Sequence, residues 1–372
     1  MTSRDAIIAV DARPLCHPGT GIYRYTRELL LRMTGLGGTW YLYSAQPYDT
    51  TGLKAVNIHH RSADVPSVVR ASQMAHLFFP QWAKRDKATV FWGPRHQLPL
   101  YLPSSVRQVV TIHDLVWQRY GHTMRFPGRQ MEAFFMPRAL READAVVAVS
   151  QFTETEIHTL YPGLAKKIEV VPGASHLADS GKSQSGRLPP ERDTGFLFVG
   201  TLEPRKNLPL LLRAYARYRE QTPHPLPLTI AGGRGWGQVD LDRHLSELHL
   251  KNCVRVPGTV SETKLAQLYR SARALVMPSL YEGFGLPVVE ALSQGVPVVV
   301  SAASAMSEVA GDAGLFVDPL NERQMAEALL SLGHDDDVHL RLRNAAANES
   351  KRYDWERSAG KMFEILTRQA NA

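Results

Sequence analysis

Two glutamates, Glu282 and Glu290, lie eight positions apart in the stretch SLYEGFGLPVVE, residues 279–290. Paired carboxylates can work as a general acid and base on one bond, or they can accept hydrogen bonds from the hydroxyl groups of a ligand. Taken singly, each has a plainer interpretation, with Glu290 as a partner of a helix dipole and Glu282 as a solvated loop residue. Which chemistry applies depends on the elements that carry the pair.

The segment 278–301 is expected to form a strand, a glycine-rich loop, a helix and a second strand. Pro287 suits the first turn of a helix, and Gly295 suits the end of one. Gly283 and Gly285 would let the backbone approach a ligand closely. The second glutamate would then lie one turn into the helix, within reach of a ribose diol, and the first would lie in the loop, within reach of a sugar.

A basic turn precedes another expected helix, in the stretch VGTLEPRKNL at 199–208. Strand 195–200 ends at Gly200, and Arg205 and Lys206 come just before a helix that begins near residue 207. Because a helix N-terminus presents free N–H groups and a partial positive charge, two cations at this point would make a diphosphate site. An exposed basic turn is the alternative.

Two further features belong to the first half of the chain. His113 ends the apolar strand 107–112, which places it at the ligand-facing edge of a parallel sheet, although a hydrogen-bonded loop cap is the plainer interpretation. Gly19 and Gly21 lie in a loop between the strand at 6–12 and a helix. The third glycine of a dinucleotide-binding loop is missing, so an NAD-binding domain is not expected.

Strands and helices alternate through most of the chain, and the apolar runs are continuous, as is typical of parallel strands that are buried on both faces. We expect an α/β protein with two Rossmann-like, doubly wound parallel-sheet domains facing a cleft. The polar stretch 176–194 is interpreted as a linker. The expected parts are a first domain at 1–175, a second at 195–350, and a C-terminal helix at 351–372 that packs back toward the first domain. The expected strands are 6–12, 39–45, 107–112, 144–149, 168–171, 195–200, 226–231, 253–257, 274–278 and 296–301, and the expected helices are 22–34, 151–160, 207–220, 240–249, 261–272 and 287–294, with a helical tail from about 322.

Composition narrows the class of protein. The chain has 372 residues, an apolar fraction of 44%, a formal net charge of +7 and a pI of about 9.4. This charge would suit nucleic acid, anionic lipid or phosphorylated small molecules, but no nucleic-acid motif accompanies it. Cys16 and Cys253 are read as reduced thiols of a cytoplasmic protein. The apolar run at 6–10 is too short for a signal peptide, and no stretch reaches the length of a membrane span.

Together these motifs are far more specific than any one of them, and the chain resembles the retaining glycosyltransferases of family 4, which have the GT-B fold. The resemblance covers essentially the whole chain and is sharper in the second half. It rests on Glu282…Glu290, on Gly200…Arg205-Lys206-Asn207, on His113, on Gly19-Thr20-Gly21, and on READAVVAVSQFT at 141–153.

The resemblance implies a role for each matching residue. Arg205 and Lys206 would hold the diphosphate of a nucleotide-sugar donor, and Glu290 would bind its ribose. Glu282 would bind hydroxyls of the donor sugar. The remaining expected contacts are backbone N–H groups of Phe284, Gly285 and Leu286 near that sugar, His113 near the reacting carbon, Gly19 and Gly21 near the acceptor and diphosphate, and the loops 231–233 and 256–260 near the nucleobase.

The implied reaction is a metal-independent hexosyl transfer with retention of anomeric configuration and no cofactor. Because no nucleophile is evident, a front-face displacement is favoured. The motifs look most like bacterial mannosyltransferases of O-antigen and other polysaccharide assembly, so GDP-mannose is the expected donor, and other GDP- or UDP-sugars stay open. The aspartates at 335–337 are expected to cap a helix rather than to bind a metal.

A lipid-linked saccharide is the expected acceptor, and a peripheral contact with the inner face of the plasma membrane stays open. Segment 124–141 interleaves arginines with aromatic residues, so it could rest on an anionic membrane or pack its aromatics inside. The loop 94–103 is a candidate edge of the acceptor site. The alternatives to a transferase are a nucleotide-sugar epimerase and a non-catalytic nucleotide-sugar-binding protein of the same fold.

Overall fold

The computed structural model describes residues 6–62, 71–177, 195–235, 237 and 240–372. Contacts within the chain divide it into two compact units. Unit 1 comprises Met1–Leu115, Pro127–Gly173 and Asp354–Ala372, and unit 2 comprises Val116–Phe126 and Ala174–Tyr353. The domain ranges expected from the sequence stay a prediction.

Unit 1 is built on a seven-stranded parallel sheet with the strand order β3-β2-β1-β4-β5-β6-β7. Because β2 and β4 both pair with β1, the strand order reverses direction between β1 and β4, which is where doubly wound sheets bind ligands. The strands are β1 Ile7–Asp11, β2 Thr39–Ser44, β3 Ile58–Ser62, β4 Val90–Gly93, β5 Arg107–Ile112, β6 Ala145–Ala148 and β7 Ile168–Val170, and the longer helices are α1 Gly21–Met33, α2 Ala71–Arg85, α4 Gly128–Glu142, α5 Gln151–Leu160 and α13 Trp355–Ala370.

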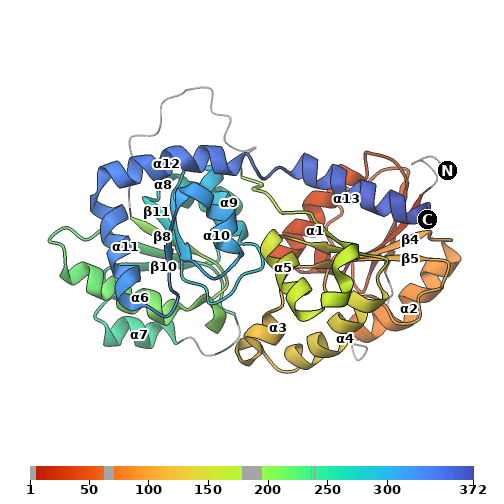
Figure 1. The fold of residues 1–372 in the computed structure, drawn as a ribbon, viewed down its shortest axis with the longest axis horizontal. Helices are drawn as coiled ribbons and strands as arrows, with labels where there is room; N and C mark the ends of the chain where they lie inside the picture. Colours follow the sequence, from red (N-terminus) through yellow and green to blue (C-terminus); the bar gives the residue numbers. More distant parts are fainter. Residues whose placement is uncertain (1–5, 63–70, 178–194, 236, 238–239) are drawn as a thin grey trace. The chain divides into compact units, whose positions relative to one another are not determined.

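Helix α13, the last in the chain, belongs to unit 1 and packs against α1 (Figure 1). Asp354 caps it by accepting a hydrogen bond from the backbone N–H of Arg357 at 2.8 Å. Its apolar face carries Trp355, whose ring lies 6.0 Å from that of Tyr25, and Phe363, which stacks on Trp40 at 6.2 Å. The chain therefore returns to its first unit at its end.

Unit 2 is a six-stranded parallel sheet with the strand order β10-β9-β8-β11-β12-β13, and the order reverses between β8 and β11. The strands are β8 Phe196–Val199, β9 Leu228–Ala231, β10 Val254–Gly258, β11 Ala274–Met277, β12 Val298–Ser301 and β13 Gly314–Val317, and the helices are α3 Val116–Arg119, α6 Leu208–Glu220, α7 Leu241–Glu247, α8 Glu262–Ser271, α9 Leu286–Ser293, α10 Ala305–Ala310, α11 Glu322–His334 and α12 Asp336–Ser350.

The expected alternation of strands and helices is confirmed at every range named from the sequence, to within about two residues at each end. The sequence pattern missed β3, β4 and α2 in the first unit and α3, α10 and β13 in the second. Strand β4 is short and fully buried, and β3 carries the polar run IHHRS at a sheet edge, so neither has the period of a half-buried strand. Helix α2 contains Pro80.

The expectation for the aspartates at 335–337 has a clear outcome. Asp335 caps α12 by accepting from the Val338 N–H at 3.0 Å, and Asp336 pairs with Arg273 at 2.6 Å, so the helix-cap interpretation of the aspartates is confirmed. Most of the stretch interpreted as a linker, 178–194, lies outside the described residues. Among the described helices, none is long and apolar enough to cross a membrane.

Candidate functional site

The backbone segments that follow β8 and β9 pack closely against each other. Gly232 follows β9, and a Cβ added there would lie 1.9 Å from the carbonyl oxygen of Gly200, at a φ of +153°. The Gly232 N–H donates to Gly258 O at 2.9 Å, which brings the loop 231–233 beside β10. Glycine is thus required where these strand ends converge, and the two loops expected near a nucleobase are neighbours.

Asn207 fixes the end of the basic turn. It adopts the left-handed conformation, with φ 56° and ψ 36°, and precedes the first residue of α6. Its side-chain amide donates to Pro278 O at 3.2 Å and to Pro319 O at 2.7 Å. These carbonyls belong to the segments that follow β11 and β13, so one side chain ties the turn to the carboxyl ends of two other strands.

Arg205, Lys206 and Glu282 form one cluster at this edge of the sheet. Lys206 Nζ lies 2.6 Å from one carboxylate oxygen of Glu282, and Arg205 lies 2.6 Å from the other. Arg205 also donates to Tyr281 O at 2.6 Å and pairs with Glu203 at 2.5 Å. Glu282 and Lys206 are each 8% exposed, so the interpretation of a solvated glutamate is wrong and the exposed basic turn is excluded.

The surrounding charges and burial shift the pKa values of the two glutamates in this cluster, Glu282 and Glu203. Burial acts to raise the pKa of Glu282, but the charges of Arg205 and Lys206 outweigh it and lower that pKa to about 2. Glu282 is therefore ionised throughout the neutral range. Burial raises the pKa of Glu203, and the nearby cations offset this only in part. The structure thus holds two oriented cations with counter-charges already beside them.

The loop between the two motif glutamates leads directly into a helix N-terminus. Gly285 precedes α9 in the left-handed region, with φ 101°, and Pro287 occupies the first turn as expected. Phe284 is buried against Tyr353, with ring centroids 5.5 Å apart. Within the described residues, the backbone N–H groups of Phe284, Gly285 and Leu286 donate no hydrogen bond. They can therefore serve an incoming oxygen ligand.

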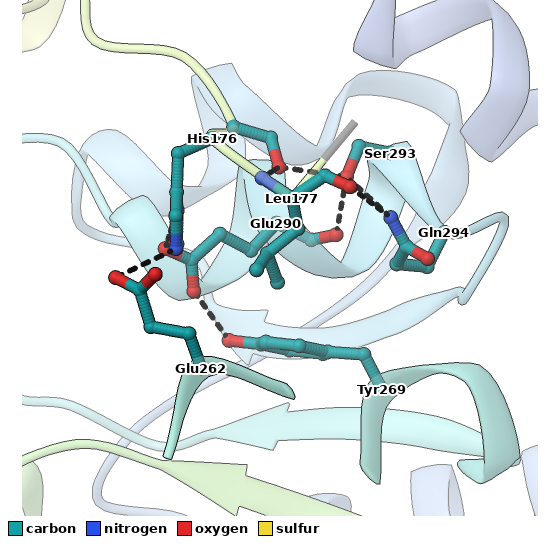
Figure 2. A network of polar contacts seen from close by, with 8 residues as sticks. His176, Leu177, Glu262, Tyr269, Glu290, Ser293 and Gln294 are labelled. Carbon is teal, nitrogen blue, oxygen red and sulfur yellow. Dashed lines mark hydrogen bonds and ion pairs between the residues drawn. The ribbon is translucent and has the colours of Figure 1, made fainter. Parts of the chain in front are cut away.

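Glu290 lies on the buried side of α9, away from bulk water. It is 2% exposed, and its carboxylate accepts a hydrogen bond from the Tyr269 hydroxyl at 2.9 Å. The other oxygen lies 3.4 Å from Nδ1 of His176 (Figure 2). Neither partner could be expected from the sequence, since Tyr269 falls in an ordinary amphipathic helix and His176 falls in the stretch interpreted as a linker.

His113 lies at the carboxyl end of β5 in unit 1, as expected. Its backbone N–H donates to His96 Nε2 at 3.0 Å, and its ring nitrogen Nε2 lies 2.8 Å from Pro94 O. The ring packs edge-on against Tyr25 at 5.0 Å. Burial, and after it the charge of His96, lower the pKa of His113 to about 4, so the imidazole is neutral near pH 7. Because Pro94 O can only accept, Nε2 carries the proton.

The glycine loop of unit 1 leads into α1. Thr20 caps α1 by accepting from the Tyr23 N–H at 3.1 Å, and Gly21 is the first residue of the helix. Gly19 has φ +88°, and a Cβ there would meet no atom within 4 Å, so its backbone faces open space. The sequence missed a buried ion pair at the end of β1, where Arg13 and Asp11 lie 2.5 Å apart.

The aromatic residues of segment 124–141 divide between surface and interior. Phe126 and Phe134 are 78% and 61% exposed. Phe135 instead stacks on His76 at 4.6 Å, and Met136 is fully buried. In the loop 94–103, Tyr101 is 81% exposed. The interpretation that the aromatic residues pack inside is therefore correct for Phe135 and wrong for Phe126 and Phe134, and the contact with an anionic membrane stays a prediction.

Comparisons with known proteins agree with this geometry. The family model described as Glycosyltransferase Family 4 matches residues 19–177, and the model described as Glycosyl transferases group 1 matches residues 181–349. The O-antigen chain mannosyltransferase B of Escherichia coli is 31% identical over 370 residues, which covers 94% of this chain and 96% of that protein. The O-antigen chain mannosyltransferase RfbU of Salmonella typhimurium is 24% identical over 357 residues, covering 93% and 96%.

Solved structures share the fold over almost the full length. Sucrose-phosphate synthase from Thermosynechococcus elongatus matches with a TM-score of 0.76 at 19% identity, covering 97% of this chain and 98% of that one. WaaG, a glycosyltransferase involved in lipopolysaccharide biosynthesis, matches with a TM-score of 0.76 at 16% identity, covering 97% and 99%. With its two doubly wound parallel sheets and its near full-length match to the E. coli enzyme, this chain belongs to the family 4 glycosyltransferases of the GT-B fold.

Proposed function

We propose that this protein transfers mannose from GDP-mannose, with retention of configuration, to a saccharide acceptor in the assembly of a bacterial surface polysaccharide. The observation that carries the proposal is the cluster of Arg205, Lys206 and Glu282 at the point where the strand order of unit 2 reverses. The two O-antigen mannosyltransferases to which the chain is similar support mannose as the sugar.

In this proposal Arg205 and Lys206 bind the donor diphosphate and stabilise the charge that develops on it as it leaves. The two cations are held by Glu282 and by the Tyr281 carbonyl before a ligand arrives, so little reorganisation is needed when the bond breaks. Glu282, ionised at neutral pH, accepts hydrogen bonds from the sugar hydroxyls. The N–H groups at the start of α9 serve the phosphate end.

The buried glutamates of the motif are poorly suited to act as a nucleophile. Glu282 is paired with two cations, which lowers its basicity, and Glu290 accepts a hydrogen bond from Tyr269. We therefore propose front-face displacement. The acceptor hydroxyl oxygen bonds to the anomeric carbon as the carbon–oxygen bond to the diphosphate breaks on the same face. A diphosphate oxygen takes the hydroxyl proton, and GDP leaves.

Charge compensation by side chains makes a metal ion unnecessary in this scheme, because Arg205 and Lys206 supply two positive charges at the diphosphate. Gly200 lies beside one of them, since a Cβ there would be in ordinary contact with Lys206 Nζ at 3.6 Å. In the first unit, neutral His113 is the proposed contact to the sugar, and Gly19 leaves its backbone open to acceptor or diphosphate.

The proposed acceptor is linked to a lipid, and the protein is proposed to act in the cytoplasm at the inner face of the membrane. Exposed Phe126 and Phe134 lie within a segment that also carries Arg125, Arg129, Arg138 and Arg141, and such a mixture suits an anionic lipid surface. Flotation with phosphatidylglycerol vesicles tests this point. We expect the wild-type chain to float with the vesicles and F134S to lose this binding. If the wild-type chain does not float, the membrane contact is refuted.

The donor is tested first with a thermal-shift panel of GDP-, UDP- and ADP-sugars. Specific binding to the folded state raises the unfolding midpoint, so GDP-mannose is expected to raise it most. If a UDP-sugar raises the unfolding midpoint more than GDP-mannose does, the donor is a UDP-sugar and the proposed nucleotide is wrong. Release of free sugar or an epimerised nucleotide-sugar, in place of transfer, would identify the chain as an epimerase or hydrolase.

A further inference from the structure

The carboxylate of Glu290 is held by two partners that the donor-binding motif does not include. Tyr269, on α8, donates its hydroxyl hydrogen to one oxygen at 2.9 Å, and His176 Nδ1 lies 3.4 Å from the other. Figure 2 shows the carboxylate between the phenol and the imidazole ring. Because Glu290 is 2% exposed, its orientation is set by these neighbours and not by water.

His176 lies between two carboxylates. Its Nε2 atom lies 3.5 Å from Glu262, at the first turn of α8, a distance that suits an ion pair, but the contact lacks hydrogen-bond geometry among the described residues. The flanking residues are fastened to the end of α9. Ser175 Oγ lies 2.8 Å from Ser293 Oγ, and Gln294 donates to Leu177 O at 3.4 Å. The short segment 175–177 thus lies against the helix that carries Glu290.

A carboxylate can accept about four hydrogen bonds, and Tyr269 and His176 each take a place on a different oxygen. A ribose diol must use the remaining lone pairs, and their direction is fixed by the same two contacts. If either contact is removed, the Glu290 carboxylate keeps its charge but can rotate. Recognition of the ribose is then weakened, while the cations that bind the diphosphate are unchanged.

We propose that Tyr269 and His176 are positioning residues that aim Glu290 at the ribose of the donor. This inference rests on the proposed function, in which Glu290 binds the ribose. Glu262, whose side chain is 73% exposed, contributes less because water competes for it. Tyr269 and His176 therefore set the preference for a ribonucleotide, whereas Arg205 and Lys206 set the affinity for the diphosphate.

The test compares the dissociation constants of GDP and 2′,3′-dideoxy-GDP by isothermal titration calorimetry, with UDP and its dideoxy analogue as a second pair. The ratio of the two constants measures recognition of the ribose hydroxyls alone. A hydrogen bond to a charged group corresponds to about a tenfold change in an equilibrium constant, so Y269F and H176A should each lower the ratio by up to about tenfold. H176Q, which keeps a donor, should recover part of it.

Matched controls separate positioning from general loosening of the fold. Y215F removes another buried hydroxyl of the same unit, which donates to Leu226 O at 2.8 Å, and H334Q removes a histidine that lies 3.0 Å from Tyr218. Both should leave the ratio unchanged. K206A should weaken both nucleotides alike.

The outcomes distinguish this inference from the proposed function. If the wild-type chain binds neither nucleotide, or binds both equally well, the proposed role of Glu290 fails and the inference fails with it. If the wild-type chain prefers GDP and E290Q loses that preference while Y269F and H176A keep it, the proposed function stands and the positioning role is overturned.

Discussion

Glu282 and an incoming diphosphate must share the same two cations. The direction in which E282Q changes the affinity for GDP therefore tests this arrangement. A phosphate oxygen bound about 2.8 Å from the Lys206 ammonium would lie no more than about 5.4 Å from the Glu282 oxygen that already pairs with it at 2.6 Å. At an effective dielectric constant between about 20 and 80, two unit charges at that distance repel by at least about 0.8 to 3 kcal/mol. In E282Q this repulsion is removed.

The expected result for E282Q is therefore tighter binding of GDP, by about 3- to 100-fold, together with a loss of sugar transfer of at least about tenfold. Transfer falls because the sugar hydroxyls lose an ionised acceptor. Isothermal titration calorimetry of GDP gives the first quantity, and release of GDP from GDP-mannose with acceptor present gives the second. E290Q is the matched control within the motif, and its GDP binding should weaken.

The substitution also removes a counter-charge from two buried cations, and breaking a buried ion pair costs about 3 to 5 kcal/mol of stability. Binding is therefore measured at low temperature, with the unfolding midpoint recorded in parallel. GDP should raise the midpoint more in E282Q than in the wild-type chain. Weaker binding of GDP to a folded E282Q would refute the idea that carboxylate and diphosphate share Arg205 and Lys206.

Three further predictions concern the same unit. In K206A, the affinity for GDP should fall about 10- to 100-fold, since a charge-assisted hydrogen bond to phosphate is lost, and calorimetry would show an unchanged affinity if Lys206 lies elsewhere. The pKa of Glu282 is lowered from its ordinary value of 4.5 to about 2, so its ion pairs stabilise the fold above about pH 4.5 and this contribution, about 3 kcal/mol at most, is lost as the pH falls toward 2. Urea unfolding of the wild-type chain and E282Q should therefore converge in stability across that window, and a constant difference would contradict the pairing. G232A should lower the unfolding free energy by at least about 2 kcal/mol because its Cβ would overlap the Gly200 carbonyl, whereas G163A, with no atom within 4 Å, should change it by less than about 0.5 kcal/mol in thermal denaturation.

The fold was largely predictable because buried parallel strands have a plain signature. The runs IIAV at 7–10 in β1 and VVV at 298–300 in β12 are apolar throughout, since both faces of a doubly wound sheet are covered by helices. The elements that were missed lack that signature. Strand β3 is a polar strand at an edge of the seven-stranded sheet. Strand β13 has four residues and lies at an edge of the six-stranded sheet, where Phe316 remains 42% exposed.

The candidate site was predictable in its position but not in its contacts. Arg205 and Glu282 are 77 positions apart, and they meet because β8 and β11 are adjacent and parallel, so their carboxyl ends share one edge. That edge could be expected from the topology. The ion pairing could not, because periodicity says nothing about side-chain direction in a loop, and an isolated glutamate in a glycine-rich turn looks solvated.

The surroundings of Glu290 were beyond reach of the sequence for a different reason. Tyr269 lies at an ordinary core-facing position of α8, where a tyrosine gives no sign of whether its hydroxyl meets a carboxylate. His176 is the first residue of the polar stretch interpreted as a linker, and no residue of a motif lies near it in the sequence. Both contacts are long-range, and only the fold brings these residues together.

The proposed roles of Arg205, Lys206 and Glu282 are tested most directly by transfer of radiolabelled mannose from GDP-mannose to lipid-linked saccharide extracted from bacterial membranes. The wild-type chain and K251A, which removes an exposed lysine of the same unit, should label the acceptor equally. K206A, which removes a charge that stabilises the transition state, and E282A, which removes the acceptor for the sugar hydroxyls and the carboxylate that orients the cations, should each lose at least about 99% of that activity. Undiminished transfer by either variant, or labelling by the wild-type chain from UDP-sugars but not from GDP-mannose, would contradict the assignment.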